Sequence, residues 1–263
     1  MTHDLAIGVD IGGTGIKAAL VDVRTGMLVS ERVKVATPPG GEPDDILSAT
    51  KQLIADIAPQ GSVPVGIAFP SIIRHGRTLL AANVSDAWLN FEAERLFETG
   101  LGRRISFVND ADAAGLAEVR YGAARGQQGL VIMTTLGTGI GGALIYDGTL
   151  IPNVELGHLE LDGHDAESRA SNAVREKHHL SWKKWAKRLQ RYYSHLEMLF
   201  SPELIIVGGG VSKYAEEFLP LLTLRTPIVP ATLRNNAGIL GAAALAWEAN
   251  GPTDTPGSVS ASA

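Results

Sequence analysis

Residues 13–21 read Gly-Thr-Gly-Ile-Lys-Ala-Ala-Leu-Val, and residues 137–145 read Gly-Thr-Gly-Ile-Gly-Gly-Ala-Leu-Ile. Each segment follows an apolar run, Leu5–Val9 or Leu130–Met133, and each leads to a second turn. The order strand, glycine turn, strand, turn and strand therefore occurs twice. Turns that expose several backbone N–H groups bind anions, and glycine lets a phosphate approach the backbone closely. The repeat predicts two domains that hold a phosphorylated ligand in a cleft between them.

The composition is that of an ordinary globular chain, with 45% hydrophobic and 19% charged residues and a formal net charge of −5. A chain of 263 residues is long enough for two modest hydrophobic cores. No apolar run reaches the length of a membrane span, and Met1–Asp4 lacks a basic and then apolar signal region. Because there is no cysteine, no disulfide is expected, and the cytoplasm is the expected location.

Strands alternate with helical patterns in both halves, which indicates an α/β architecture. We expect an N-terminal domain at residues 1–106 with the first glycine turn, and a C-terminal domain at residues 107–236 with the second. The tail at residues 251–263, rich in Pro, Thr, Ser, Gly and Ala, is expected to be mobile.

Asp10-Ile11-Gly12-Gly13-Thr14-Gly15-Ile16-Lys17 resembles the first phosphate motif of the sugar-kinase, actin and Hsp70 superfamily. Within that superfamily the chain resembles the ROK family of sugar kinases. The further matching motifs, in chain order, are Asn109–Ala114, Leu136–Gly142, Glu155–His158 and Gly208–Gly210. The resemblance covers residues 5–249. It implies a two-domain, ribonuclease H-like fold with a cleft between duplicated domains, and a last helix at 237–248 that packs back on the first domain.

The resemblance is greatest to the short polyphosphate/ATP-dependent glucokinases of that family. It implies transfer of a phosphoryl group to the 6-hydroxyl of glucose, from inorganic polyphosphate or ATP, with Mg²⁺ and a homodimeric chain. The residues do not decide whether mannose is also an acceptor, since mannose differs from glucose at only one hydroxyl group. Many ROK kinases carry a cysteine-rich zinc motif after the Gly-His pair, whereas Gly157–Ser171 has no cysteine, so no zinc is expected.

Two other functions fit parts of the pattern. One is an ATP-only ROK hexokinase. The other is a sugar-binding ROK regulator, which carries an additional N-terminal DNA-binding domain. Because the first phosphate strand starts at Leu5, we expect no such domain here.

Asp110 is the candidate general base for the sugar hydroxyl. It follows the apolar run Ile105–Val108 and precedes a helical pattern, so it lies at a strand end, where α/β proteins place ligand groups. The alternative is that an acidic or amide residue here only caps the helix at 113–121. Capping explains one such residue, whereas Asn109, Asp110 and Asp112 are three in four positions.

The two glycine turns are the candidate phosphate sites. Asp10 is placed to hold hydrated Mg²⁺, and Lys17 to supply a positive charge to the phosphates. The remaining candidates are Gly12, Gly13, Thr14 and Gly15 in the first turn and Gly137, Thr138 and Gly139 in the second. The alternative for the first turn is a plain hairpin, which does not require Asp10 or Lys17.

The candidate sugar set is Asn109, Asp110, Glu155, His158 and Glu167, in which acceptors and donors match hydroxyl groups. Glu167 begins the motif Glu-Ser-Arg-Ala-Ser, which resembles a family segment whose Glu also contacts the sugar. From the residues alone, Glu155 and His158 are also compatible with a surface pair or a core histidine, and a metal role lacks an obvious third ligand. Phe69, Pro70, Ser71 and Asn83 are expected to line the pocket. Gly208, Gly209 and Gly210 are the candidate adenosine site, although an ordinary strand–helix turn explains them equally well.

A basic strip runs from Arg175 to Arg191, with seven basic residues and one acidic residue. Ser181 is a candidate cap for a helix at 182–200 with one apolar face. The opposite face carries Lys183, Lys184, Lys187, Arg188 and Arg191. Such a stripe favours a polyanion, here polyphosphate. Nucleic acid and membrane are not expected, since the aromatics and the apolar face are needed in the core. The alternative is a solvated helix face.

Overall fold

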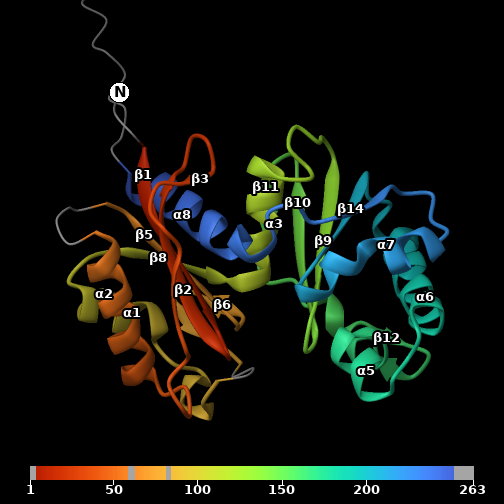
Figure 1. The fold of residues 1–263 in the computed structure, drawn as a ribbon, viewed down its shortest axis with the longest axis horizontal. Helices are drawn as coiled ribbons and strands as arrows, with labels where there is room; N and C mark the ends of the chain where they lie inside the picture. The colour runs from red at the N-terminus through yellow and green to blue at the C-terminus, as the bar shows by residue number, and fades with distance from the viewer. Residues whose placement is uncertain (1–3, 59–62, 81–83, 252–263) are drawn as a thin grey trace, which may run out of the picture.

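The computed structural model describes residues 4–58, 63–80 and 84–251, which form two β-sheets with helices on their faces (Figure 1). Two sequence predictions, the role of Asn83 and the mobility of residues 252–263, lie outside the described residues. In the first half the elements are β1 (Leu5–Gly12), β2 (Gly15–Asp22), β3 (Met27–Leu28), β4 (Val33–Val35), α1 (Pro43–Ile57), β5 (Val65–Phe69), β6 (Ile73–Arg74), β7 (Arg77–Thr78), the 3-10 turn η1 (Asp86–Trp88), α2 (Ala93–Leu101) and β8 (Ile105–Asn109).

Helix α3 (Asp110–Tyr121) leads into the second half. The elements there are β9 (Leu130–Leu136), β10 (Ile140–Tyr146), β11 (Thr149–Ile151), η2 (Leu156–His158), β12 (Glu160–Leu161), β13 (His164–Asp165), α4 (Glu167–Ala170), α5 (Asn172–Lys177), α6 (Trp182–Phe200), β14 (Leu204–Gly208), η3 (Gly210–Tyr214), α7 (Ala215–Phe218), η4 (Leu219–Leu221), β15 (Ile228–Pro230), η5 (Arg234–Asn236) and α8 (Ala237–Asn250). None of the described helices combines the length and apolar character needed to cross a membrane.

The two sheets share one topology. Their strand orders are β3-β2-β1-β5-β8, with β4 also paired to β2, and β11-β10-β9-β14-β15. In each sheet the first three strands pair antiparallel and the last two join parallel. The repeated glycine segments form the equivalent hairpins β1–β2 and β9–β10. The predicted fold, two duplicated α/β domains, is therefore confirmed.

The alternation of large and small residues in β1 determines which helix covers each face of the first sheet. Ile7, Val9 and Ile11 pack in one core with residues of α1 and α2. Ala6 lies on the opposite face, in a core that also contains residues of α3, α8 and the second sheet. A strand places successive side chains on opposite faces, so the small residues leave room for a helix there. In Figure 1, α3 and α8 lie between the two sheets.

Helix α8 packs on the first sheet, although it follows the second half in sequence. A Cβ built at Gly66 of β5 would lie 1.9 Å from the carbonyl oxygen of Ala242 in α8, so the helix backbone touches the strand. β8 pairs in parallel with β5 as far as Phe69↔Asn109, so this sheet extends past the predicted limit at residue 106.

We expect Gly66→Ala to destabilise the fold by at least about 1–3 kcal/mol, the usual cost of overpacking a closely packed interior. The added methyl group would meet backbone rather than a flexible side chain, so α8 must move away from β5. Denaturant unfolding measures the change. Gly210→Ala is the control, since its Cβ would meet no atom within 4 Å. Wild-type stability of the Gly66 variant would contradict this close packing.

Candidate active site

Two cavities lie between the halves of the protein and meet at Asp110. The first, of about 500 Å³, is lined by the predicted sugar residues Asn109, Asp110, Glu155, His158 and Glu167, together with Gly137, Thr138, Gly139, Pro70 and Ser71. The second, of about 550 Å³, is lined by Asp10, Lys17, Gly208, Gly209 and Gly210, and again by Asp110. Among the described residues, Asp110 is the only charged one that lines both cavities. Phe69, predicted to line the pocket, is instead buried in the core of the first half, because it packs against other aromatic rings there.

Asp110 begins α3, and its neighbour Asn109 caps that helix. The Asn109 amide oxygen accepts hydrogen bonds from the N–H groups of Ala111 at 2.8 Å and Asp112 at 3.0 Å, and its amide nitrogen donates to the Ser71 carbonyl. The capping role proposed as an alternative therefore falls to Asn109. Asp110 Oδ1 accepts from the Ala111 N–H at 2.8 Å, and Oδ2 has no hydrogen-bond partner among the described residues.

The electrostatic surroundings of Asp110 favour a proton acceptor near neutral pH. Desolvation by the enclosing protein and, to a smaller extent, the negative charge of Asp10 together raise the pKa of Asp110 to about 7, against the lowering effect of the Ala111 hydrogen bond. A carboxyl group with a pKa near the working pH is suited to general-base chemistry.

His158 lies between two carboxylates in the first cavity. Its Nδ1 is 2.8 Å from Asp165 Oδ2 on β13, and its Nε2 is 4.0 Å from Glu155 Oε2. The hydrogen bond that the His158 ring donates to Asp165 raises the pKa of His158, and burial raises the pKa of Glu155. The sequence shows no third metal ligand beside Glu155 and His158, but Asp165 and Glu167 each place an oxygen within 4.8 Å of a His158 nitrogen and of one another.

Glu167 connects the first cavity to the second glycine turn. Its Oε2 accepts a hydrogen bond from the Ile140 N–H at 3.0 Å. A Cβ built at Gly139 would lie 2.3 Å from the same oxygen, so this position requires glycine for the carboxylate to reach the turn.

Asp10 and Lys17 face each other across the β1–β2 hairpin and line the second cavity. They are register partners, and Lys17 Nζ is 2.8 Å from Asp10 Oδ2. The tip of the hairpin, Gly12, Gly13, Thr14 and Gly15, is not among the residues that line either cavity.

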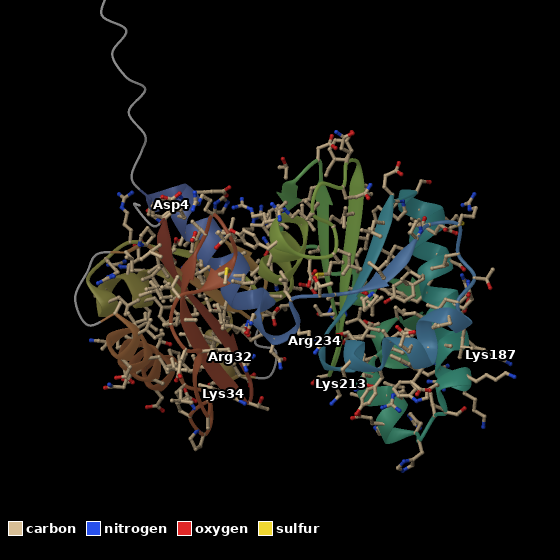
Figure 2. The ribbon with its side chains drawn as sticks, turned by 45° about the horizontal axis from the view of Figure 1, so that its top comes forward. Asp4, Arg32, Lys34, Lys187, Lys213 and Arg234 are labelled. Carbon is tan, nitrogen blue, oxygen red and sulfur yellow. The ribbon has the colours of Figure 1, made fainter. Side chains whose placement is uncertain are left out.

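The basic stripe is on α6, which has the predicted bounds and the predicted Ser181 cap. Trp185, Leu189, Tyr192, Tyr193 and Leu196 are buried on its apolar face, whereas Leu199, near the C-terminal end of that face, is exposed. None of the five basic residues of the stripe lines either cavity. Arg191 is paired with Asp162 at 2.8 Å, and Arg188 donates to the Arg169 carbonyl. Figure 2 shows Lys187 at the outer edge of the second half, away from the space between the halves.

Several residues of the cavities were not predicted from the sequence. The second cavity is also lined by Thr135, Ser212, Lys213 and Arg234, and Asp165 holds His158 from outside the first. These side chains carry no motif of their own. Only the positive charge of Lys213 and Arg234, each next to a glycine-rich or asparagine-rich turn, is a signal that the sequence contains.

The duplicated sheets and the cleft between them define the two-domain, actin-like fold of the sugar kinases. The sequence profile of the ROK family matches residues 6–173. The chain belongs to the ROK family, which confirms the resemblance seen in the motifs.

Three relatives show how far the similarity extends. A polyphosphate glucokinase of Mycobacterium tuberculosis (strain CDC 1551 / Oshkosh) is 45% identical over 92% of this chain and 91% of its own. The crystal structure of an inorganic polyphosphate/ATP-glucomannokinase from Arthrobacter sp. strain KM has a TM-score of 0.85 and 55% identity, over 91% of this chain and 96% of that one. The crystal structure of a ROK family glucokinase from Streptomyces griseus, in complex with glucose and AMPPNP, has a TM-score of 0.78 and 28% identity, over 93% of this chain and 99% of that one.

Proposed function

We propose that the protein transfers the terminal phosphoryl group of inorganic polyphosphate or ATP to the 6-hydroxyl of glucose. The observation that carries the proposal is the place of Asp110 where the two cavities meet. One cavity then holds the sugar and the other the phosphoryl donor, with the base between them. The polyphosphate glucokinase and glucomannokinase relatives support both donors.

The first cavity takes the sugar. Its carboxylates and His158 can pair with several hydroxyl groups, which favours a hexose over less hydroxylated molecules. We include mannose as a second acceptor, because the 55% identical relative is a glucomannokinase.

In the reaction, the oxygen of the sugar 6-hydroxyl attacks the terminal phosphorus of the donor while Asp110 accepts the hydroxyl proton. The bond between that phosphorus and its bridging oxygen breaks, and the shortened donor leaves with the bridging oxygen. Lys17 in the second cavity and the N–H groups of the second glycine turn, Gly137–Gly139 in the first cavity, stabilise the charge on the transferred group. The glycines at 208–210 offer backbone to an adenosine, without side chains in the way.

The donor set of the second cavity fits Mg²⁺. Asp10 and Asp110 both line this cavity and both offer carboxylate oxygens as ligands. The negative charge of Asp10 disfavours ionisation of Asp110, and a divalent cation between them would remove this repulsion. Asp10 would hold the ion through water. When bound, Mg²⁺ neutralises phosphate charge.

An assay with purified protein tests the function. Long-chain polyphosphate and ATP are each combined with glucose, mannose and fructose, and hexose 6-phosphate is measured. We expect product from glucose with both donors. Product with ATP alone would identify an ATP-only ROK hexokinase and overturn the polyphosphate proposal.

Asp165→Asn is expected to raise the KM for glucose about 3–10-fold, with a smaller change in kcat. The carboxylate fixes Nδ1 of His158 and so presents the other ring nitrogen to the cavity, while Asp165 itself lines neither cavity. NMR titration should show a lower His158 pKa in the variant. Asp162→Asn is the control, since that carboxylate pairs with Arg191. An unchanged KM, or an equal change in the control, would contradict this positioning role.

We expect less than 0.1 zinc per purified chain, on the order of a trace contaminant. The His158, Asp165 and Glu167 group contains no thiolate, and two of its atoms already bond each other. Elemental analysis checks this, and about one zinc per chain would contradict it. We also propose that the protein is a homodimer, as its resemblance to the short polyphosphate/ATP-dependent glucokinases implies. Light scattering measures the mass of the assembly directly.

A further inference from the structure

Four basic side chains lie at the opening of the second cavity, two from each half of the protein. Lys213 and Arg234, from the second half, line the cavity. Lys34 on β4 is the register partner of Lys17, which lines it. Arg32 donates a 2.8 Å hydrogen bond to Asn236, at the end of the 3-10 turn that contains Arg234. Figure 2 shows the four on the two sides of the space between the halves.

These four residues carry positive charges that no ion pair neutralises in the described part of the chain. All four are exposed, and none has a carboxylate oxygen within 4 Å among the residues that the structure describes. Lys17, deeper in the cavity, differs because it is paired with Asp10. Lys213 rests 4.8 Å over the Tyr214 ring, which fixes the ammonium group but leaves its charge in place. Like charges on facing sides of a cleft repel one another, and an anion bound between them removes that electrostatic repulsion.

The position of Asp110 in the second cavity indicates which anion the four basic residues would bind. Its inner end is at Asp110, where the terminal phosphoryl group must lie for transfer to the sugar. In ATP the adenosine follows the third phosphate group, and the proposed adenosine site at residues 208–210 lines this same cavity. A longer phosphate chain must continue outward, and the opening with the four basic residues is its way out.

We propose that Arg32, Lys34, Lys213 and Arg234 form the track along which a long inorganic polyphosphate leaves the second cavity. The inference rests on the proposed function and specifies the donor subsite. Lys213 and Arg234, which line the cavity, contact the phosphate units that leave it, and Arg32 and Lys34 contact units beyond those that ATP possesses.

The stripe on α6 is the competing track, and its geometry makes it a matched control. Lys183 and Lys187 are exposed like Arg32 and Lys34, but they lie on a helix that lines neither cavity. Removing two charges from either place changes the net charge of the protein equally.

The experiment compares Arg32→Gln/Lys34→Gln with Lys183→Gln/Lys187→Gln. The probes are ATP, inorganic tripolyphosphate and long-chain polyphosphate, with glucose as acceptor. We expect kcat/KM for long-chain polyphosphate to fall by about 10-fold in the first variant, equivalent to two exposed ion contacts. Tripolyphosphate and ATP should change by less than about twofold, which also shows that the variant folds. The salt dependence of the long-chain KM should weaken, since fewer phosphate contacts release fewer counterions.

Three results would overturn the track. Equal losses with all three donors would show that Arg32 and Lys34 support the cavity in general. A selective loss in the α6 variant would place the track on that helix. Full long-chain activity in both variants would leave the opening without a role. Failure of the wild-type protein to use any polyphosphate would instead overturn the proposed donor itself, and the two failures are therefore distinguishable.

Discussion

Asp110→Asn is expected to lower kcat by about 10²–10⁴-fold with both donors, the usual contribution of a general base. The amide cannot take the 6-hydroxyl proton, although it keeps the size of the side chain and can still accept the Ala111 N–H. The glucose dissociation constant should change little, because the other sugar residues are untouched. Steady-state kinetics and calorimetry measure the two quantities.

Asp112→Asn is the matched control for this variant. Asp112 lies two residues further along α3, and burial likewise raises its pKa to about 7. Its Oδ2 accepts a 2.7 Å hydrogen bond from the Asn153 N–H, and it lines neither cavity. Activity should therefore survive. A loss of kcat in the Asp112 variant equal to that in the Asp110 variant would contradict a specific role for Asp110.

The pKa of Asp110 also predicts the pH profile. A base must be ionised, and the group is mostly protonated below its pKa of about 7. Wild-type kcat/KM should therefore fall about tenfold for each pH unit below 7 and level off above it. A profile flat down to pH 5 would contradict both the raised pKa and the base role.

Lys17→Met is expected to lower kcat by about 10²–10³-fold with ATP and with polyphosphate, a range typical for loss of one group that stabilises charge in the transition state. Both donors must bring a terminal phosphoryl group to the same end of the second cavity, where Lys17 lies. The variant also leaves the partly buried Asp10 without its partner. Initial rates with each donor measure the effect.

Lys17→Arg keeps the positive charge and should retain more activity than Lys17→Met. If the Met variant lost activity with only one of the donors, ATP and polyphosphate would not share the phosphate site, and the proposal of one donor cavity would be wrong.

Much of the fold was predictable because its determinants are local and repeated. The two glycine segments predict equivalent hairpins, and the two sheets have the same strand order. Helix α6 was predictable to the residue, since Ser181 caps it and Ser201-Pro202 ends it. The limit of the first sheet was not, because the pairing of Asn109 with Phe69 depends on a strand forty residues away.

The candidate site, like the fold, was predictable from the sequence only in part. Asn109, Asp110, Glu155, His158 and Glu167 belong to motifs, and the structure brings all of them to one cavity. Asp165, Lys213 and Arg234 belong to none, and only the fold brings them to the cleft. Helical periodicity on α6 identifies the exposed face of the helix but says nothing about where that face points, which here is away from both cavities.

The claim that one site between the halves serves both donors is tested most directly by mixing them. Glucose phosphorylation is measured with saturating ATP, with saturating polyphosphate, and with both together. Because the two donors exclude each other from the second cavity, we predict a mixed rate between the two single-donor rates. A mixed rate equal to their sum would show two independent sites and contradict the account.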